Sequence, residues 1–169
     1  MFSILIESPS DRIQDDMISM IDKLKNKETH IILITTNKPY KTVRETLKRA
    51  KINTDNISFI DCVSLSIEQD DNVNVSFILD ISDLSSLSIM VKKYFERIHG
   101  KKFLFLDAVH TLWIYRKSNI IARFVQGIIE HAYHSDTNII FFIVDINDKD
   151  LLRKIVPLFD YFVHYKRET

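Results

Sequence analysis

Carboxylates at the ends of apolar segments are the residues in this chain best placed to do chemistry. Asp107 directly follows the apolar residues 103–106, and Glu7 follows residues 4–6. Because the carboxyl ends of parallel strands meet at one edge of a sheet, Asp107 with Glu7 or Asp145 could bind Mg²⁺. Alternatively, Asp107 caps a turn or accepts local N–H bonds. We favour the second interpretation and expect no metal site.

A glycine-rich phosphate loop is absent from the sequence. The chain has only two glycines, Gly100 and Gly127, so the pattern G-x-x-x-x-G-K-[ST] cannot be formed. Residues 7–12 follow the first apolar segment instead, and they include Glu7 and Asp11. These carboxylates would repel a polyphosphate at the helix N-terminus, where an anion is otherwise favoured.

The alternation of short apolar segments with segments of helical period predicts a mainly parallel sheet covered by helices on both faces. We expect one α/β domain over residues 1–169 with three α/β/α layers. In the first helix, Ser8 should be the N-cap, Pro9 the first helical residue and Asp11 the end of a capping box. Strands are expected at residues 2–6, 31–35, 57–62, 75–79, 103–107, 138–144 and 161–165. Further helices are expected after Pro39 and near residues 84–98, 120–132 and 149–156.

Composition narrows the class of protein. The 169 residues are 46% hydrophobic and 27% charged, as in a globular domain. A chain of this length can bury about 70% of its unfolded surface when it folds. The single Cys62 cannot form an internal disulfide and no leader-like segment precedes the first strand, so we expect a cytoplasmic location. Basic and acidic residues number 23 each. Nucleic acid is therefore a possible but not a favoured partner, and no apolar segment is long enough for a membrane helix.

Two surface features could contact a partner. Lys41, Arg44 and Lys48 fall on one face of the helix after Pro39, where they could meet phosphates or an acidic protein surface, or simply be solvated. Trp113 and Tyr115 flank Ile114, and three such large side chains are difficult to bury together. They could anchor a protein contact or pack in the core.

The order of these segments resembles a RecA-superfamily domain of the KaiC and RadA kind. The resemblance rests on residues 4–9, residues 33–39, residues 103–107 followed by Thr111-Leu112, and the helix-strand-helix-strand ending. It implies a RecA-like P-loop NTPase fold without the Walker A phosphate loop. The degenerate nucleotide-site positions implied by the resemblance are Glu7, Ser8, Asp11, Asn37 and Asp107.

The departures from this family's pattern predict that ATP is not hydrolysed. Active relatives carry a glutamate after the second strand to activate water, whereas this chain has Asn37, which cannot accept a proton as a general base. We therefore expect no catalytic residue and no cofactor. The expected function is a protein-interaction or signalling and regulatory module with a protein partner or as a homodimer.

Two alternatives stay open. The domain could bind a nucleotide or Mg²⁺ without hydrolysis. It could instead be a receiver-like signalling domain, as Asp107, Thr35-Thr36 and Lys149 suggest. A receiver needs an acidic pair after its first strand, and Glu7 followed by Ser8 and Pro9 fits that need poorly.

Overall fold

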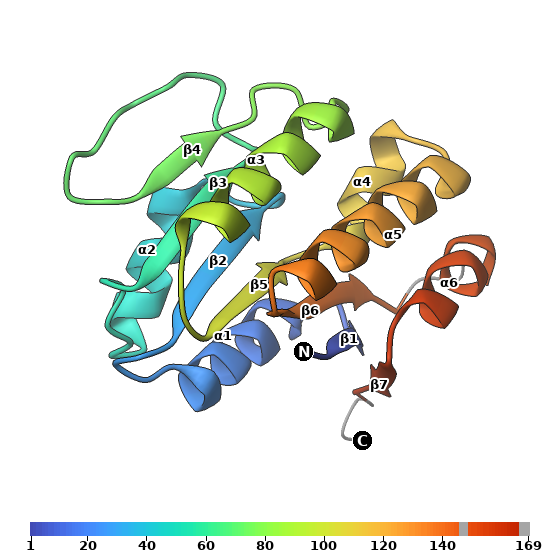
Figure 1. The fold of residues 1–169 in the computed structure, drawn as a ribbon, viewed down its shortest axis with the longest axis horizontal. Coiled ribbons are helices and arrows are strands. Elements are labelled where there is room, and N and C mark those ends of the chain that lie inside the picture. Colours follow the sequence, from blue (N-terminus) through green and yellow to red (C-terminus); the bar gives the residue numbers. More distant parts are fainter. Residues whose placement is uncertain (146–148, 166–169) are drawn as a thin grey trace.

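A seven-stranded parallel sheet organises the chain in a computed structural model that describes residues 1–145 and 149–165 (Figure 1). The strands are β1 (Ser3–Ser8), β2 (His30–Thr35), β3 (Ile57–Asp61), β4 (Val75–Phe77), β5 (Lys102–Leu106), β6 (Thr137–Val144) and β7 (Tyr161–His164). The helices are α1 (Ile13–Leu24), α2 (Tyr40–Arg49), α3 (Leu84–Arg97), α4 (Val109–Tyr115), α5 (Ser118–His134) and α6 (Lys149–Ile155), followed by the 3₁₀ turn η1 (Val156–Leu158).

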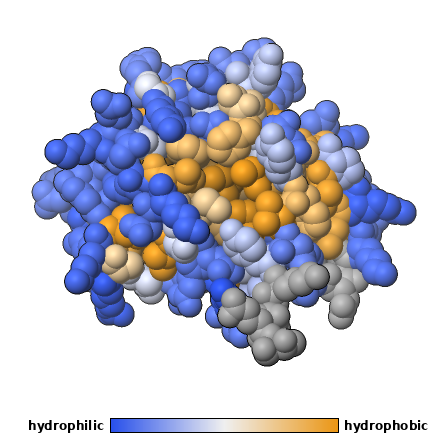
Figure 2. Space-filling model, turned by 90° about the horizontal axis from the view of Figure 1, so that it is seen from below, coloured by the Kyte–Doolittle hydropathy of each residue, from blue (hydrophilic) through white to orange (hydrophobic). Residues whose placement is uncertain are grey.

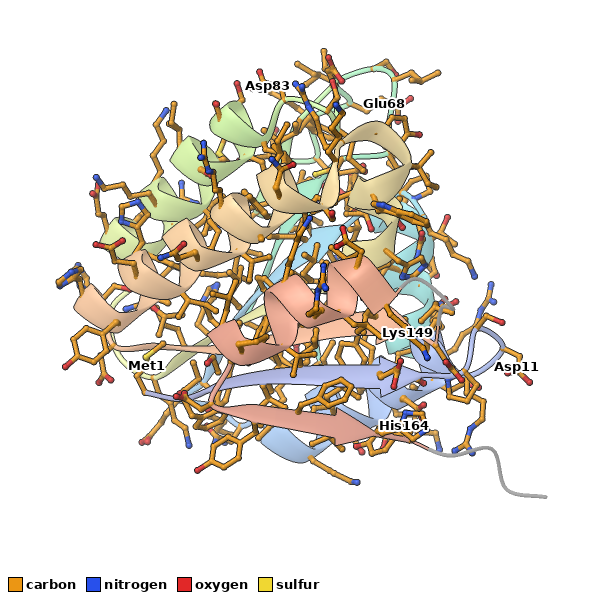
Figure 3. The ribbon with its side chains drawn as sticks, turned by 90° about the vertical axis from the view of Figure 1, so that its right-hand side faces the viewer. Met1, Asp11, Glu68, Asp83, Lys149 and His164 are labelled. Carbon is orange, nitrogen blue, oxygen red and sulfur yellow. The ribbon has the colours of Figure 1, made fainter. Side chains whose placement is uncertain are left out.

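The strand order is β4-β3-β2-β5-β6-β1-β7, and every neighbouring pair is parallel. β1 therefore lies between β6 and β7, and β6 separates it from β5. A receiver-like fold would place its first strand beside its second and third, so the receiver-like alternative is wrong. In Figure 3, Asp11, Lys149 and His164 lie toward the end to which the β1 and β7 arrows point, with Met1 at the other end.

Continuous apolar segments form the central strands because helices cover both faces of the sheet. All five residues of β5 are buried, as are five of the six in β2. Buried residues of α1 and α2 form one core with the sheet, and those of α3, α4, α5 and α6 form a larger core on the other face. The predicted three-layer α/β/α arrangement is confirmed.

The face with fewer helices leaves an apolar area near one edge of the sheet. Figure 2 shows this area from below, over α1 and β7. Several hydrophobic side chains there pack against the smaller core while staying half-exposed: Phe2, Ile4, Met20, Leu24, Val163 and Tyr165. Tyr161 and Phe162 of β7 are 61% and 42% exposed. No helix among the described residues is long and apolar enough to cross a bilayer.

The predicted capping box at the start of α1 is wrong. Ser8 is the last residue of β1, paired with Val144 of β6, and its hydroxyl donates to Asp16. The chain then turns, with the amides of Arg12 and Ile13 both donating to the Pro9 carbonyl at 2.9 and 3.0 Å. The helix begins only at Ile13, without a side-chain cap from Arg12. Pairing of β1 with its neighbours thus overrides the local capping signal.

Candidate functional site

Asp107 is buried at the carboxyl end of β5, where it binds the segment that follows β2. The Thr36 amide donates to its two carboxylate oxygens at 2.9 and 3.1 Å, and the Thr36 hydroxyl donates at 2.6 Å. The Asn37 amide donates at 3.4 Å. This geometry supports the interpretation of Asp107 as an acceptor of local N–H bonds.

Burial also changes the acidity of this carboxyl. Asp107 is only 7% exposed, and desolvation raises its pKa to about 6 although the hydrogen bonds from Thr36 and Asn37 act in the opposite direction. The carboxyl therefore titrates close to neutral pH rather than near its usual value.

Glu7 and Asp145 make different contacts from Asp107. The Glu7 carboxylate contacts Nδ1 of His164, its register partner on β7. Asp145 follows β6, and its amide donates to the Ser8 carbonyl at 3.1 Å. Within the described ranges, no three His, Cys, Asp or Glu side chains are grouped so that they could hold a metal ion.

A second buried aspartate, Asp61 at the end of β3, was not among the site residues predicted from the sequence. Its carboxylate accepts hydrogen bonds from the Tyr40 amide at 3.0 Å, the Val63 amide at 2.8 Å, and the amide and hydroxyl of Ser64 at 2.9 and 2.7 Å. It thereby fixes the first turn of α2 and the start of the β3–β4 connection. The signal was available, because residues 57–61 end in Asp after an apolar segment just as residues 103–107 do.

The carboxyl edge of the sheet contains a cavity of about 340 Å³. It lies between the turn after β1 and the loop after β2, and Asp11, Asn37 and Asp107 line it together with Ser10, Gln14, Lys38 and the apolar Ile13, Met17 and Val43. Three of the five predicted nucleotide-site positions therefore meet in one cavity. Glu7 and Ser8, the other two, are outside its lining.

The polar groups around this cavity bind one another. Lys38 Nζ donates to Gln14 Oε1 at 2.6 Å, and Asn37 Oδ1 accepts from the Thr111 hydroxyl at 2.7 Å. The backbone amides on both sides are also engaged, with Pro9 O on one side and the Asp107 carboxylate on the other. A phosphate would need such amides free to point at it.

The predicted basic face of α2 is partly covered by the chain itself. Lys41 contacts the Glu68 carboxylate, and Arg44 lies 4.0 Å from that of Asp70. Lys48 pairs with Glu45 of the same helix at 3.8 Å. Acidic side chains of the β3–β4 connection thus contact Lys41 and Arg44, two of the three basic residues predicted to meet a partner.

The other predicted contact residues lie on α4, a helix that the sequence did not predict. Trp113, Ile114 and Tyr115 are 42%, 72% and 53% exposed, whereas Val109 and Leu112 of the same helix are fully buried. All three side chains lie on the surface, so the alternative in which they pack in the core is wrong.

Cys62 and His110 show no sign of nucleophilic or metal chemistry. Burial raises the pKa of the Cys62 thiol, mainly through desolvation, which keeps it from forming the reactive thiolate. His110 Nδ1 accepts a hydrogen bond from the Val144 amide at 3.2 Å, and burial lowers its pKa. Cys62 is buried in the core, and His110 is partly buried beside β6.

Several solved structures have a fold similar to that of this chain. An uncharacterised protein from Pyrococcus horikoshii, solved in complex with an unknown peptide, aligns with a TM-score of 0.72 at 10% identity, covering 98% of this chain and 77% of that one. A KaiC-like protein from the same organism aligns with a TM-score of 0.68 at 7% identity, covering 99% and 73%. The chain has a KaiC-like fold. A third Pyrococcus horikoshii protein aligns with a TM-score of 0.62 at 13% identity, covering 98% and 82%.

These similarities confirm the predicted RecA-like architecture, and at such low identity they show the fold alone. Neither a family model nor a curated protein matches the sequence. Function must therefore be argued from the chemistry of this chain's own residues.

Proposed function

We propose that this KaiC-like domain has lost ATP hydrolysis and acts as a protein-interaction module in signalling or regulation, with α4 as its contact surface. The observation that carries the proposal is the exposure of Trp113, Ile114 and Tyr115 as three consecutive large side chains. Large rigid aromatic side chains are typical anchors of protein contacts.

The local structure keeps these side chains in position. Val109 and Leu112 are fully buried and attach α4 to the core. Arg116, directly after the helix, donates from Nε to the Ser82 carbonyl at 2.7 Å and ties α4 to the β4–α3 connection. That connection also carries Leu79, which is 54% exposed. A preformed contact surface loses less entropy when a partner binds.

The proposed loss of hydrolysis rests on the occupied donors at the carboxyl edge. The chain has no glycine-rich loop, the turn before α1 directs two amides at the Pro9 carbonyl, and Asp107 binds the amides of Thr36 and Asn37. Asn37 offers no general base. One structural neighbour was solved with a peptide, which agrees with a role in protein contact.

A nucleotide- or Mg²⁺-binding module without hydrolysis is the second candidate. The cavity of about 340 Å³ beside Asp107 and Lys38 favours it, because both a carboxylate and a cation face the same space. This candidate predicts Mg²⁺-dependent binding of ATP or ADP, with a rise in melting temperature.

Calorimetric and thermal-shift titrations with ATP, ADP and Mg²⁺ decide between the two candidates. We expect neither heat of binding nor a melting shift, and no release of phosphate from ATP. Mg²⁺-dependent binding would establish the second candidate, and phosphate release would overturn the proposed inactivity altogether.

The contact surface is tested through Trp113, the only tryptophan in the chain, whose emission reports directly on α4. A homodimer formed through α4 would blue-shift this emission as the protein concentration rises, in step with the mass measured by sedimentation. I114S should abolish both changes, whereas I89S, at a 58% exposed isoleucine of α3, should leave them intact.

A different partner would be identified with a photo-crosslinking residue placed at position 114 and, as the control, at position 89. Specific crosslinks from position 114 support α4 as the contact surface. Equal products from both positions, together with monomeric behaviour at every concentration, would refute it.

A further inference from the structure

The long connection between β3 and β4 lies along α2 and forms a strap, defined here as residues 64–72. Figure 1 shows this connection as a wide loop. In Figure 3, Glu68 of this loop lies near the top of the view, whereas His164 on β7 lies near the bottom. Its first residue, Ser64, binds Asp61 through its amide and hydroxyl. Just beyond its end, Asn74 Nδ2 donates to Ser58 Oγ at 2.8 Å. Both ends are fixed to the sheet.

Charge holds the middle of the strap against α2. Lys41 and Glu68 form an ion pair in which both side chains are more than half exposed, and Arg44 lies 4.0 Å from Asp70. The exposed Lys41–Glu68 pair contributes little to stability and weakens with salt. The Arg44–Asp70 pair is partly buried, and its separation of 4.0 Å is long for an ion pair. The apolar side chains of the strap do not anchor it either, because Leu65 and Ile67 are 91% and 60% exposed. The middle of the strap can therefore leave α2 without unfolding the core.

A small hollow of about 180 Å³ lies beneath the strap, lined among others by Tyr40, Lys41, Glu68 and Phe77. Tyr40 is 2% exposed, and its hydroxyl has no hydrogen-bond partner in the part of the chain that the structure describes. Buried tyrosine hydroxyls normally find a partner. Desolvation raises the pKa of Tyr40, which keeps the hydroxyl protonated and able to donate. Tyr40, which carries this buried donor, thus lines the hollow together with Lys41.

We propose that Tyr40, Lys41 and Arg44 form a docking site for an acidic peptide segment of a partner protein, and that the strap occupies this site until the partner displaces it. Glu68 and Asp70, two residues apart on a segment without regular secondary structure, pair with cations three residues apart on the helix. The strap is thus an intramolecular stand-in for the partner. The site is separate from α4 and does not depend on it.

The charges favour a peptide over nucleic acid as the occupant. The segment that fills the site is itself a peptide that carries carboxylates. The formal net charge of the chain is +0, so no overall field attracts a polyanion. Nucleic-acid sites that track a backbone usually add exposed aromatic side chains for stacking, and the one aromatic residue of α2, Tyr40, is buried.

Fluorescence anisotropy with a labelled peptide of the strap's own sequence, residues 64–72, tests the proposal on the full chain. The strap competes with this peptide at an effective concentration in the millimolar range, as expected for a short tether. The strap variant E68Q/D70N should therefore bind the peptide at least about tenfold more tightly than the natural chain. A peptide with Gln and Asn in place of its acidic residues should not bind.

Two further changes locate the site. K41Q/R44Q in the strap variant should abolish binding, and Y40F should weaken it several-fold, whereas K92Q/K93Q, a pair of exposed lysines on α3, should leave it unchanged. I114S should also have no effect, which separates this result from the role of α4. Circular dichroism and melting curves establish that each variant is folded.

Equal affinity of the natural chain and the strap variant for the acidic peptide would overturn the proposal, as would equal binding of the neutral peptide. Displacement of the peptide by a single-stranded oligonucleotide that itself binds more tightly would assign the site to nucleic acid instead. Retained affinity in K41Q/R44Q would place the peptide elsewhere on the surface.

Discussion

Asp61 and Asp107 end strands on either side of β2, and both bind the segment that leads from β2 into α2. Asp107 accepts from Thr36 and Asn37, and Asp61 accepts from the Tyr40 amide. Two buried carboxylates thus hold residues 36–40 between them. In a parallel sheet this segment lies at the ligand-binding edge. Here the carboxylates that reach it stabilise the loop.

Replacement of Asp61 should destabilise the protein strongly. D61A removes the acceptor of the Tyr40, Val63 and Ser64 amides, and the buried Tyr40 amide then loses its partner among the described residues at a penalty of about 1–3 kcal/mol. With the other lost bonds we expect a fall of about 3 kcal/mol in the free energy of unfolding, measured by urea denaturation. D61N keeps one carbonyl acceptor and should lose less. Equal losses in both variants would show that the hydrogen bonds are not the cause.

The pKa of Asp107 predicts a pH dependence of stability. This pKa rises from an ordinary value near 4 in the unfolded chain to about 6 in the fold. The folded state therefore holds the proton more tightly, so the stabilising contribution is complete below about pH 4 and is lost as the pH rises through about 6. Two pH units correspond to about 3 kcal/mol.

Urea denaturation between pH 4 and pH 7, compared between the natural protein and D107N, isolates this contribution from that of the histidines. The natural protein should lose stability relative to D107N as the pH rises, by up to about 3 kcal/mol. A difference that does not change with pH would contradict the raised pKa.

At the scale of elements, continuous apolar segments were the dependable signal. The strands β5 and β6 were predicted from residues 103–107 and 138–144 because strands buried on both faces have nearly continuous apolar sequences. The start of α1 could not be predicted in the same way. Its residues 8–11 have the types of a capping box, and only the pairing of Ser8 with β6 shows that they serve as a strand end and a turn. α4 has only seven residues, too few for a clear helical period.

Substitutions on the buried and exposed sides of α4 should change the free energy of unfolding by very different amounts. L112A removes a fully buried side chain and should lower the free energy of unfolding by about 2–5 kcal/mol. I114S changes a side chain that is 72% exposed and should alter stability by less than about 0.5 kcal/mol while removing the proposed contact. Urea denaturation of both variants checks this. A large loss of stability in I114S would mean that Ile114 packs within the protein and would weaken α4 as a contact surface.

At the scale of the whole molecule, long-range pairing decided what the sequence could reveal. Convergence of Asp11, Asn37 and Asp107 at one cavity follows from strands that end at a common edge, and this much was predictable. The exclusion of Glu7 was not, because it requires knowing that β6 separates β1 from β5. Periodicity likewise showed a basic helix, but not that Glu68, 27 positions from Lys41, covers part of it.

The edge of the sheet at β7 should promote self-association when the protein is concentrated or heated. Within the described residues, β7 pairs only with β1, and its four residues include no lysine or proline of the kind that protects natural edges. The half-exposed apolar area over α1 and β7 adjoins this edge (Figure 2). Both features favour pairing with another extended segment.

Y161K places a charge on this edge at a side chain that is 61% exposed, and light scattering should then detect association only at higher concentration or temperature. Y133K makes the same change of charge at a 71% exposed tyrosine of the helix α5, outside the sheet, and therefore controls for net charge. Because both tyrosines are largely exposed, neither substitution should change the free energy of unfolding by more than about 0.5 kcal/mol. Equal protection by the two variants would trace the effect to net charge and leave β7 without a special role. Protection by Y161K alone would identify strand pairing at β7 as the cause of this association at high concentration or temperature.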